Sequence, residues 1–248
     1  KIYTSSNSQN LISIGNLSPV TSTLNINVQK TNLEIIKLDK DTHKTTPQGD
    51  ASLIGTVFEV YNNSNTKLKE ITLEEETFKL ENLNYGKYYI LEKTPGKGYH
   101  LNTNKYEFEI SKSSPNISIQ IENQVIKKEI EINKLFGAGN NFIPEKNISF
   151  NIYNSKNEFL TTIKTNNQGQ INITLPYGTY TIKQLTTTEG YQKVNPIQIT
   201  VDNEEKEIIT LKNYKINVPN TYTTEKNIFI KLINYIKKLC QNIKLQLY

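Results

Sequence analysis

Short runs of alternating apolar and polar residues follow one another through the middle of the chain, separated by clusters rich in Asn, Gly, Ser and Pro. Such alternation places successive side chains on opposite faces of a β-strand, and no helical period competes with it here. The pattern predicts an all-β fold. In the second half of the chain it predicts strands over residues 129–135, 148–153, 159–164, 170–175, 179–185, 197–201 and 207–213.

The chain also repeats itself, because three separated motifs recur at one constant spacing. Phe58-Glu-Val-Tyr61-Asn62 returns as Phe150-Asn-Ile-Tyr153-Asn154, Leu83-Asn-Tyr85-Gly86 returns as Leu175-Pro-Tyr177-Gly178, and Gly98-Tyr99 returns as Gly190-Tyr191. The repeat predicts two tandem β-sandwich domains, over residues 32–126 and 127–214. Residues 1–31, with one strand expected over 24–28, are interpreted as a linker or the end of a preceding unit.

The C-terminal part of the chain has a different pattern. After a linker over residues 215–226, apolar side chains in 227–248 follow helical spacing at Ile228, Leu232, Tyr235, Ile236, Leu239 and Ile243. Lysines interrupt this apolar run and disfavour a membrane-spanning segment. The segment is expected to form a short amphipathic helix at a membrane surface or against a partner, or to be a degenerate membrane anchor. Cys240 lies on its apolar side and is interpreted as a packing residue.

The alternation also directs several polar side chains toward the interior of each predicted domain. Stepping two residues at a time from apolar neighbours identifies a lysine in the first strand, an asparagine in the last strand, and a glutamate or glutamine in a middle strand. In the first domain these residues are Lys37, Asn123 and Glu92, and in the second they are Lys134, Asn213 and Gln184.

Burying a lone ammonium or carboxylate is costly, so these positions need a physical reason. Burial lowers the pKa of a lysine and raises that of a carboxylic acid, which allows a neutral amine and a neutral acid to coexist in a dry core. An amine held against an asparagine side chain can attack it, expel ammonia and leave an uncharged amide, with the acid relaying protons. The alternative is that these residues lie at strand ends, where lysine reaches water and asparagine caps a turn.

Composition narrows the classes of function. The net charge is +5, but the bases are all lysine, which disfavours nucleic acid as a partner. A single cysteine excludes an internal disulfide. His43, His100 and the Asp39-Lys-Asp41 stretch are interpreted as solvated surface, so no metal site or cofactor is predicted. No arrangement typical of a turnover enzyme is visible.

Together the motifs resemble the Cna B-type domains, the prealbumin-like repeats of adhesin stalks and pilins of Gram-positive bacteria. The resemblance rests on a lysine strand, Glu34-Ile-Ile-Lys37-Leu-Asp39, on the repeated motifs above, on Tyr88-Tyr-Ile-Leu-Glu92, and on a closing Ile121-Glu-Asn123. It implies reverse immunoglobulin-like sandwiches, with Lys37 and Asn123 as an isopeptide-bonded pair and Glu92 as the catalytic acid. Gln184 departs from the pattern, so a bond is expected in the first domain and not in the second, where Lys134 and Asn213 are expected to remain hydrogen-bonded.

The resemblance implies a stalk or pilin-like part of an extracellular, cell-surface or cell-wall protein, joined to neighbouring domains of a longer chain. A bond between the first and last strands would close a long loop, worth about 4–5 kcal/mol if it acts as a disulfide does, and would carry load applied to the domain ends. Two alternatives are an adhesin module that binds host matrix through loops such as 42–52, and an accessory domain of a secreted enzyme.

A sorting motif is the last candidate feature. Val218, Pro219, Asn220, Thr221 and Tyr222 resemble a sortase signal, with valine in place of leucine and tyrosine in place of glycine. The resemblance makes sortase a candidate partner.

Overall fold

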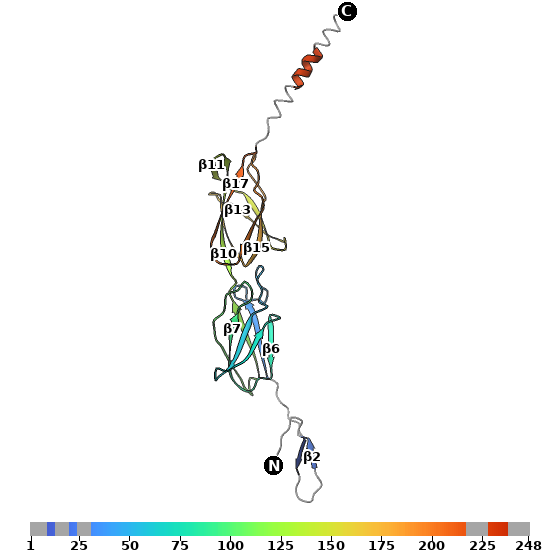
Figure 1. Cartoon of the computed structure of the whole chain (residues 1–248), viewed down its shortest axis with the longest axis vertical. Coiled ribbons are helices and arrows are strands. Elements are labelled where there is room, and N and C mark those ends of the chain that lie inside the picture. Colours follow the sequence, from blue (N-terminus) through green and yellow to red (C-terminus); the bar gives the residue numbers. More distant parts are fainter. Residues whose placement is uncertain (1–8, 13–19, 24–30, 217–227, 238–248) are drawn as a thin grey trace, which may run out of the picture. The chain divides into compact units, whose positions relative to one another are not determined.

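The computed structural model of the chain describes residues 9–12, 20–23, 31–216 and 228–237 (Figure 1). The chain divides into two compact units, Lys1–Ile126 and Lys127–Tyr248. Near the start, β1 (Gln9–Ile12) and β2 (Val20–Thr23) form an antiparallel pair. The strand expected over residues 24–28 lies outside the described residues.

From β3 to β9 the first unit is a sandwich of two sheets (Figure 1). One sheet has the order β6 (Thr77–Glu81), β3 (Asn32–Asp39), β9 (Asn116–Asn123). The other has the order β5 (Lys67–Thr72), β4 (Val57–Asn62), β7 (Gly86–Thr94), β8 (Tyr106–Ile110). Apolar side chains from both sheets fill the space between them, including Leu33, Ile35, Phe58, Val60, Ile90 and Ile121. The alternation in the sequence therefore reports a core buried between two pleated faces.

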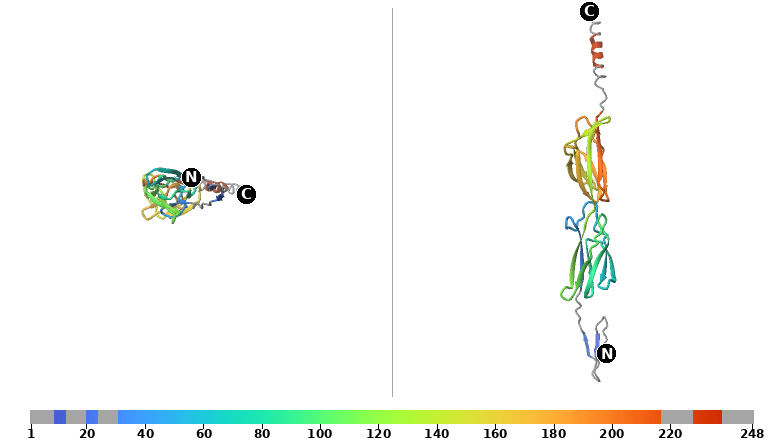
Figure 2. Two further views of the ribbon diagram at one scale, coloured as in Figure 1. Left: turned by 90° about the horizontal axis from the view of Figure 1, so that it is seen from below. Right: turned by 90° about the vertical axis from the view of Figure 1, so that its left-hand side faces the viewer.

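The second unit repeats this plan, and Figure 2 shows its strands from a second side. In one sheet β10 (Lys127–Ala138) pairs with β11 (Asn141–Pro144), β14 (Gln170–Pro176) and β17 (Glu207–Tyr214). The other has the order β13 (Phe159–Lys164), β12 (Ser149–Tyr153), β15 (Gly178–Gln184), β16 (Ile197–Val201). All the strands predicted for this unit are confirmed, whereas β11 was not predicted.

In both units the first and last strands run side by side in parallel. β3 pairs with β9 in a register that places Lys37 opposite Ile121 and Asp39 opposite Asn123. β10 pairs with β17 so that Lys134 is opposite Leu211 and Phe136 is opposite Asn213. In each case the asparagine lies one same-face step beyond the lysine on the neighbouring strand, so the two side chains can meet diagonally.

The described part of the C-terminal segment, residues 228–237, is helical and its side chains are exposed. This confirms a short helix after an otherwise all-β chain. None of the helices in the described residues is long and apolar enough to cross a membrane. The sorting-like residues 218–222, together with Leu239, Cys240 and Ile243, lie outside the described residues.

Candidate functional site

The first unit brings its three predicted polar side chains into one buried pocket. Lys37 from β3 and Asn123 from β9 approach from one sheet, and Glu92 from β7 approaches from the other. Lys37 is 0% exposed, Asn123 is 1% exposed and Glu92 is 6% exposed. The interpretation of Lys37 as a strand-end lysine that reaches water is therefore wrong.

The contacts within this pocket join all three groups. Lys37 Nζ makes a very short contact with Asn123 Oδ1, and it lies 3.2 Å from Glu92 Oε2. Asn123 Nδ2 donates to the other carboxylate oxygen, Glu92 Oε1, at 2.6 Å and to the carbonyl oxygen of His100 at 2.9 Å. Glu92 thus bridges the lysine amine and the asparagine amide, with one oxygen near each nitrogen.

Burial controls the chemistry of the amine. Desolvation lowers the pKa of Lys37 below its ordinary value of 10.5, and the neighbouring Glu92 opposes this effect only in part. The ring of Phe58, itself fully buried, lies 5.8 Å from Nζ and forms part of the apolar surroundings. A lysine in this environment is shifted toward its neutral, nucleophilic form.

A loop closes over the pocket and fixes the acid. The backbone N–H of Asn102 donates to Glu92 Oε1 at 3.1 Å. The side chain of Asn102 in turn donates to the carbonyl oxygen of Glu122 at 2.7 Å and to the hydroxyl of Tyr106 at 2.8 Å. These bonds hold the carboxylate in one orientation, between the lysine and asparagine nitrogens.

The second unit holds an equivalent lysine and asparagine. Lys134 and Asn213 are both 0% exposed and occupy the same diagonal positions on the paired first and last strands. Desolvation lowers the pKa of Lys134 as well, opposed by a hydrogen bond and charge from Glu145. The lysine and asparagine of the first pocket therefore have equivalents in the second. The carboxylate does not, because it comes from a different position in the fold.

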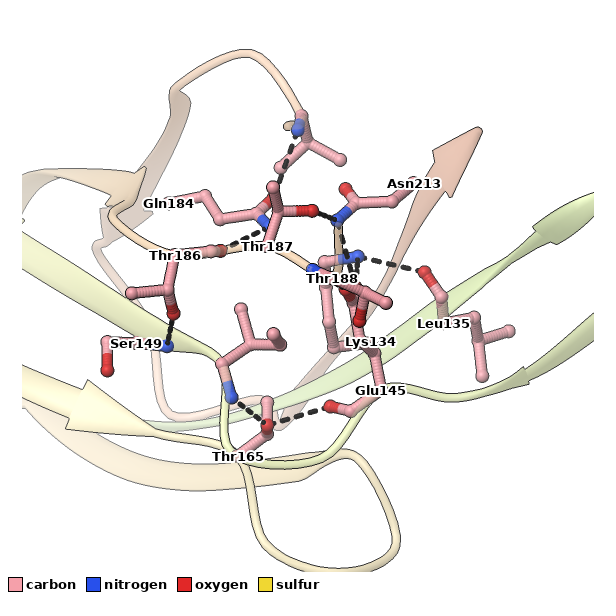
Figure 3. A network of polar contacts seen from close by, with 12 residues as sticks. Lys134, Leu135, Glu145, Ser149, Thr165, Gln184, Thr186, Thr187, Thr188 and Asn213 are labelled. Carbon is pink, nitrogen blue, oxygen red and sulfur yellow. Dashed lines mark hydrogen bonds and ion pairs between the residues drawn. The ribbon is translucent and has the colours of Figure 1, made fainter. Parts of the chain in front are cut away.

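Glu145, which follows β11, lies between these two side chains (Figure 3). Its Oε2 is 2.6 Å from Lys134 Nζ and accepts a hydrogen bond from Asn213 Nδ2 at 2.9 Å. Glu145 is 1% exposed. This acid was not predicted from the sequence. It links Lys134 and Asn213, which make no direct hydrogen bond to each other, since Asn213 Oδ1 has no partner among the described residues.

Gln184 occupies the strand position of Glu92 but makes only part of its contacts. Glu92 pairs with Phe58 across β7 and β4, and Gln184 pairs with Phe150 across β15 and β12. Gln184 Oε1 accepts the backbone N–H of Val194 at 3.0 Å, just as Glu92 accepts that of Asn102.

The other end of the Gln184 side chain does not reach the lysine. Its Nε2 donates to the carbonyl oxygen of Thr186 at 2.7 Å, so the amide is turned toward that loop, as Figure 3 shows. One residue, Glu92, contacts both the loop and the lysine in the first unit, whereas in the second unit Gln184 contacts the loop and Glu145 contacts the lysine.

Sequence reasoning missed Glu145 because β11 has only four residues, Asn-Phe-Ile-Pro, and no alternation long enough to assign. The available signal was the pair Asn140-Asn141 ahead of Phe142, which is typical of a turn between two paired strands. A hairpin there places the residue after Pro144 beside Lys134, and Glu145 N donates to the Lys134 carbonyl oxygen at 2.8 Å.

One surface interpretation in the first unit needs correction. Asp39 is 0% exposed rather than solvated. Its carboxylate accepts hydrogen bonds from Tyr99, Thr42 and Gln48, which organises the following loop. His43 is exposed but not isolated, since its Nδ1 lies 2.6 Å from Glu122 Oε1. Among the described residues, no group of three or more His, Cys, Asp or Glu comes together as a metal site would require.

The fold is similar to that of solved structures of bacterial proteins. The Bacillus anthracis TIE protein is 28% identical in sequence, with a TM-score of 0.61, over 80% of this chain and 38% of that protein's chain. The chain therefore spans well under half of that protein. A C-terminal fragment of the pilus adhesin SpaC from Lactobacillus rhamnosus GG shares the fold at 15% identity and a TM-score of 0.54, over 77% of this chain and 99% of the fragment.

No curated protein matches the chain. Residues 31–125 and 128–215, which make up most of the chain, match the family described as SpaA, prealbumin-like fold domain. This match confirms the resemblance to prealbumin-like repeats and the tandem all-β fold. The chain belongs to the SpaA family of prealbumin-like fold domains, carrying two of them in tandem.

Proposed function

We propose that the chain is a stalk or pilin-like part of a bacterial surface protein, braced by a covalent Lys37–Asn123 isopeptide bond in its first unit. The observation that carries this proposal is the pocket in which Lys37 Nζ lies against Asn123 Oδ1 with Glu92 bridging both groups. Family membership supports the structural role, because the chain's domains are of the kind found in pilins and pilus adhesins.

The first step is the loss of a proton from Lys37, because only a neutral amine has the lone pair that attacks a carbonyl carbon. Glu92 Oε2 lies 3.2 Å from Nζ and can take this proton. The transfer leaves the net charge of the pocket unchanged. A neutral amine and a neutral acid are also less costly to bury than an ion pair.

Bond formation then uses both oxygens of the acid. Lys37 Nζ attacks Cγ of Asn123, and the protonated carboxyl of Glu92, whose Oε1 lies 2.6 Å from Nδ2, delivers the proton that it took from Lys37 to the departing nitrogen. The Cγ–Nδ2 bond breaks, ammonia leaves, and Glu92 recovers a proton from the attacking nitrogen. The product is one amide in place of an amine and a primary amide. The reaction occurs once, so the chain is not an enzyme with turnover.

The closed pocket explains why a modest nucleophile would suffice. Neighbouring strands hold the amine and the amide in contact, which replaces a bimolecular encounter by a reaction of high effective molarity. No cofactor takes part in these steps. The bond would join β3 to β9 across 86 residues of chain and supply the brace that a chain with one cysteine cannot obtain from a disulfide.

Peptide mapping of the full chain tests this proposal. The expected product is a branched peptide in which the Lys37 segment is joined to the Asn123 segment, lighter than its two parts by one ammonia. Asn123→Ala should abolish the branch. Asn116→Ala, on an exposed position of the same strand, should retain it. Recovery of free Lys37 and Asn123 peptides from the unchanged chain would contradict the proposal.

An adhesin role through the 42–52 loop stays an alternative. Partners of the stalk would be neighbouring domains of a longer surface protein, with sortase or host matrix as further candidates. Binding measurements on the isolated tandem units against extracellular-matrix proteins distinguish the two roles, since specific and saturable binding is expected of an adhesin and not of a spacer.

A further inference from the structure

The second unit presents a lysine, an asparagine and a carboxylate in a pocket at least as buried as the first. Lys134, Glu145 and Asn213 are each no more than 1% exposed. The diagonal placement of the lysine and asparagine on parallel strands is the same in both units. Both units therefore place a lysine amine and an asparagine amide at equivalent positions on paired strands.

Glu145 contacts both nitrogens that such a reaction would change. A single oxygen, Oε2, lies 2.6 Å from Lys134 Nζ and 2.9 Å from Asn213 Nδ2. Proton transfer from the amine to the leaving nitrogen can therefore pass through one atom. In the first unit the two contacts fall on different oxygens of Glu92, so the two acids reach the same pair of groups by different geometry.

The remaining oxygen and the backbone of Glu145 are fixed in place. Oε1 accepts the backbone N–H of Thr188 at 2.9 Å, and the Glu145 carbonyl oxygen accepts the hydroxyl of Thr165 at 2.8 Å. The Thr165 side chain is buried and also accepts the N–H of Ile148 at 2.8 Å. These contacts hold the acid in one position, as a group that relays protons must be held.

The asparagine is oriented by a second donor–acceptor contact. Asn213 Nδ2 donates to Thr187 Oγ1 at 2.7 Å as well as to Glu145. Its Oδ1 is buried and is without a hydrogen-bond partner in the part of the chain that the structure describes. A buried carbonyl oxygen without a hydrogen-bond partner carries a desolvation cost that needs a physical reason, and loss of the amide in a reaction is one such reason.

We infer that Lys134 and Asn213 form a second isopeptide bond, with Glu145 as its catalytic residue in place of Gln184. Lys134 Nζ attacks Cγ of Asn213, the Cγ–Nδ2 bond breaks, and ammonia leaves with a proton relayed by Glu145. Glu145 regains a proton from the attacking nitrogen, so the acid is regenerated. The inference rests on the chemistry proposed for the first unit, but it concerns different residues.

The intact mass of the full chain separates the two claims. Two bonds remove the mass of two ammonia molecules relative to the sequence, and mapping should yield a Lys134–Asn213 branched peptide beside the Lys37–Asn123 one. If only the Lys37–Asn123 branch forms, the inference is overturned and the proposed function stands. If only the Lys134–Asn213 branch forms, the proposed site in the first unit fails and the inference stands.

Variants then test the role of Glu145. Glu145→Gln preserves size and hydrogen-bonding capacity but cannot relay protons as an acid does. The variant should therefore form only the Lys37–Asn123 bond and lose one ammonia instead of two. The matched control is Glu158→Gln, which makes the same exchange at an exposed position of the second unit and should retain both bonds. Retention of the second bond in Glu145→Gln would overturn the assignment.

A rate measurement covers the case in which Glu145→Gln does not fold. Glu145→Asp keeps the acid but shortens it, and the chain should form the second bond more slowly than the first after refolding. Mapping at successive times gives both rates in one sample, with the Lys37–Asn123 branch as the internal standard. Equal rates for the second bond in Glu145→Asp and the unchanged chain would overturn a catalytic role for this residue.

Discussion

Gln184 and Glu92 occupy equivalent strand positions, each paired with a buried phenylalanine on the neighbouring strand. The side chain of each accepts the backbone N–H of the residue ten positions further along the chain. Only the carboxylate of Glu92 also contacts a lysine. Glutamine at this position is therefore compatible with the fold of these units, which makes the exchange of the acid for its amide a clean test of chemistry rather than of folding.

Glu92→Gln should abolish the first bond while the unit still folds. The unit should then lose about 4–5 kcal/mol of unfolding free energy, by analogy with a disulfide closing a loop of similar length. Denaturation in urea and intact mass, measured on the same preparation, check both effects. Glu109→Gln, which alters an exposed carboxylate on β8, is the control and should change neither quantity.

Asn123→Ala leaves Lys37 as a buried, unbonded amine, and its stability should rise with pH. Burial lowers the pKa of Lys37 from 10.5 in the folded state. Between the lowered value and 10.5 the unfolded chain binds more protons than the folded chain, so raising the pH favours folding in that window. Thermal unfolding at a series of alkaline pH values should show this slope in Asn123→Ala.

The bonded chain provides the contrast for this pH dependence. An amide nitrogen does not titrate in this range, so the unchanged protein and Asn116→Ala should lack the contribution from Lys37. Parallel slopes for Asn123→Ala and Asn116→Ala would show either that Lys37 is unbonded in both or that its burial has no consequence.

Gly169→Ala should destabilise the second unit more than Gly190→Ala does. Both glycines have positive φ, +71° and +81°, where an alanine costs roughly 1–2 kcal/mol. A Cβ at Gly169 would also lie 2.6 Å from the Lys134 carbonyl oxygen and 2.9 Å from Glu145 N, whereas nothing lies within 4 Å at Gly190. Urea denaturation of the two variants measures the stability that the close packing around Gly169 contributes. Equal losses of unfolding free energy in both variants would contradict that packing.

Tyr99→Phe should destabilise the first unit by about 1.5–3 kcal/mol, because it removes a buried hydrogen bond to a carboxylate. Tyr99 is 3% exposed and its hydroxyl donates to Asp39 Oδ2 at 2.8 Å. Burial, with the Asp39 contact adding to it, raises the pKa of Tyr99 above its ordinary value of 10.0. Tyr85→Phe, at a position 53% exposed, is the control and should have little effect.

Titration followed by tyrosine absorbance provides a second readout for Tyr99. The unchanged chain should contain a late-titrating tyrosine that Tyr99→Phe lacks. Loss of stability without loss of that late-titrating group would indicate that the variant acts through packing and not through the Asp39 hydrogen bond.

The sequence alone predicted that several polar side chains point into the core. Strand geometry has a period of two, so neighbouring apolar residues fix the face of each polar one, as at Lys37, Asn123, Lys134 and Asn213. The two-sheet plan of the second unit followed from the same alternation. These features depend on local sequence, and local sequence was sufficient to find them.

Glu145 and Asp39 could not be found in this way, because their burial is produced by contacts distant in the chain. Glu145 is placed by a short hairpin and by Thr165, which lies 20 residues further on. Asp39 is covered by Tyr99, 60 residues away. A carboxylate beside a turn looks solvated in the sequence until the segment that covers it is known.

The pairing of first and last strands also affects how such a stalk would respond to proteases. If Lys37 is joined to Asn123 as proposed, every loop between β3 and β9 lies inside the closed covalent ring. A single cut in any of these loops opens the ring but leaves the two pieces attached through the amide. A nicked unit would still keep its N-terminal and C-terminal neighbours covalently connected.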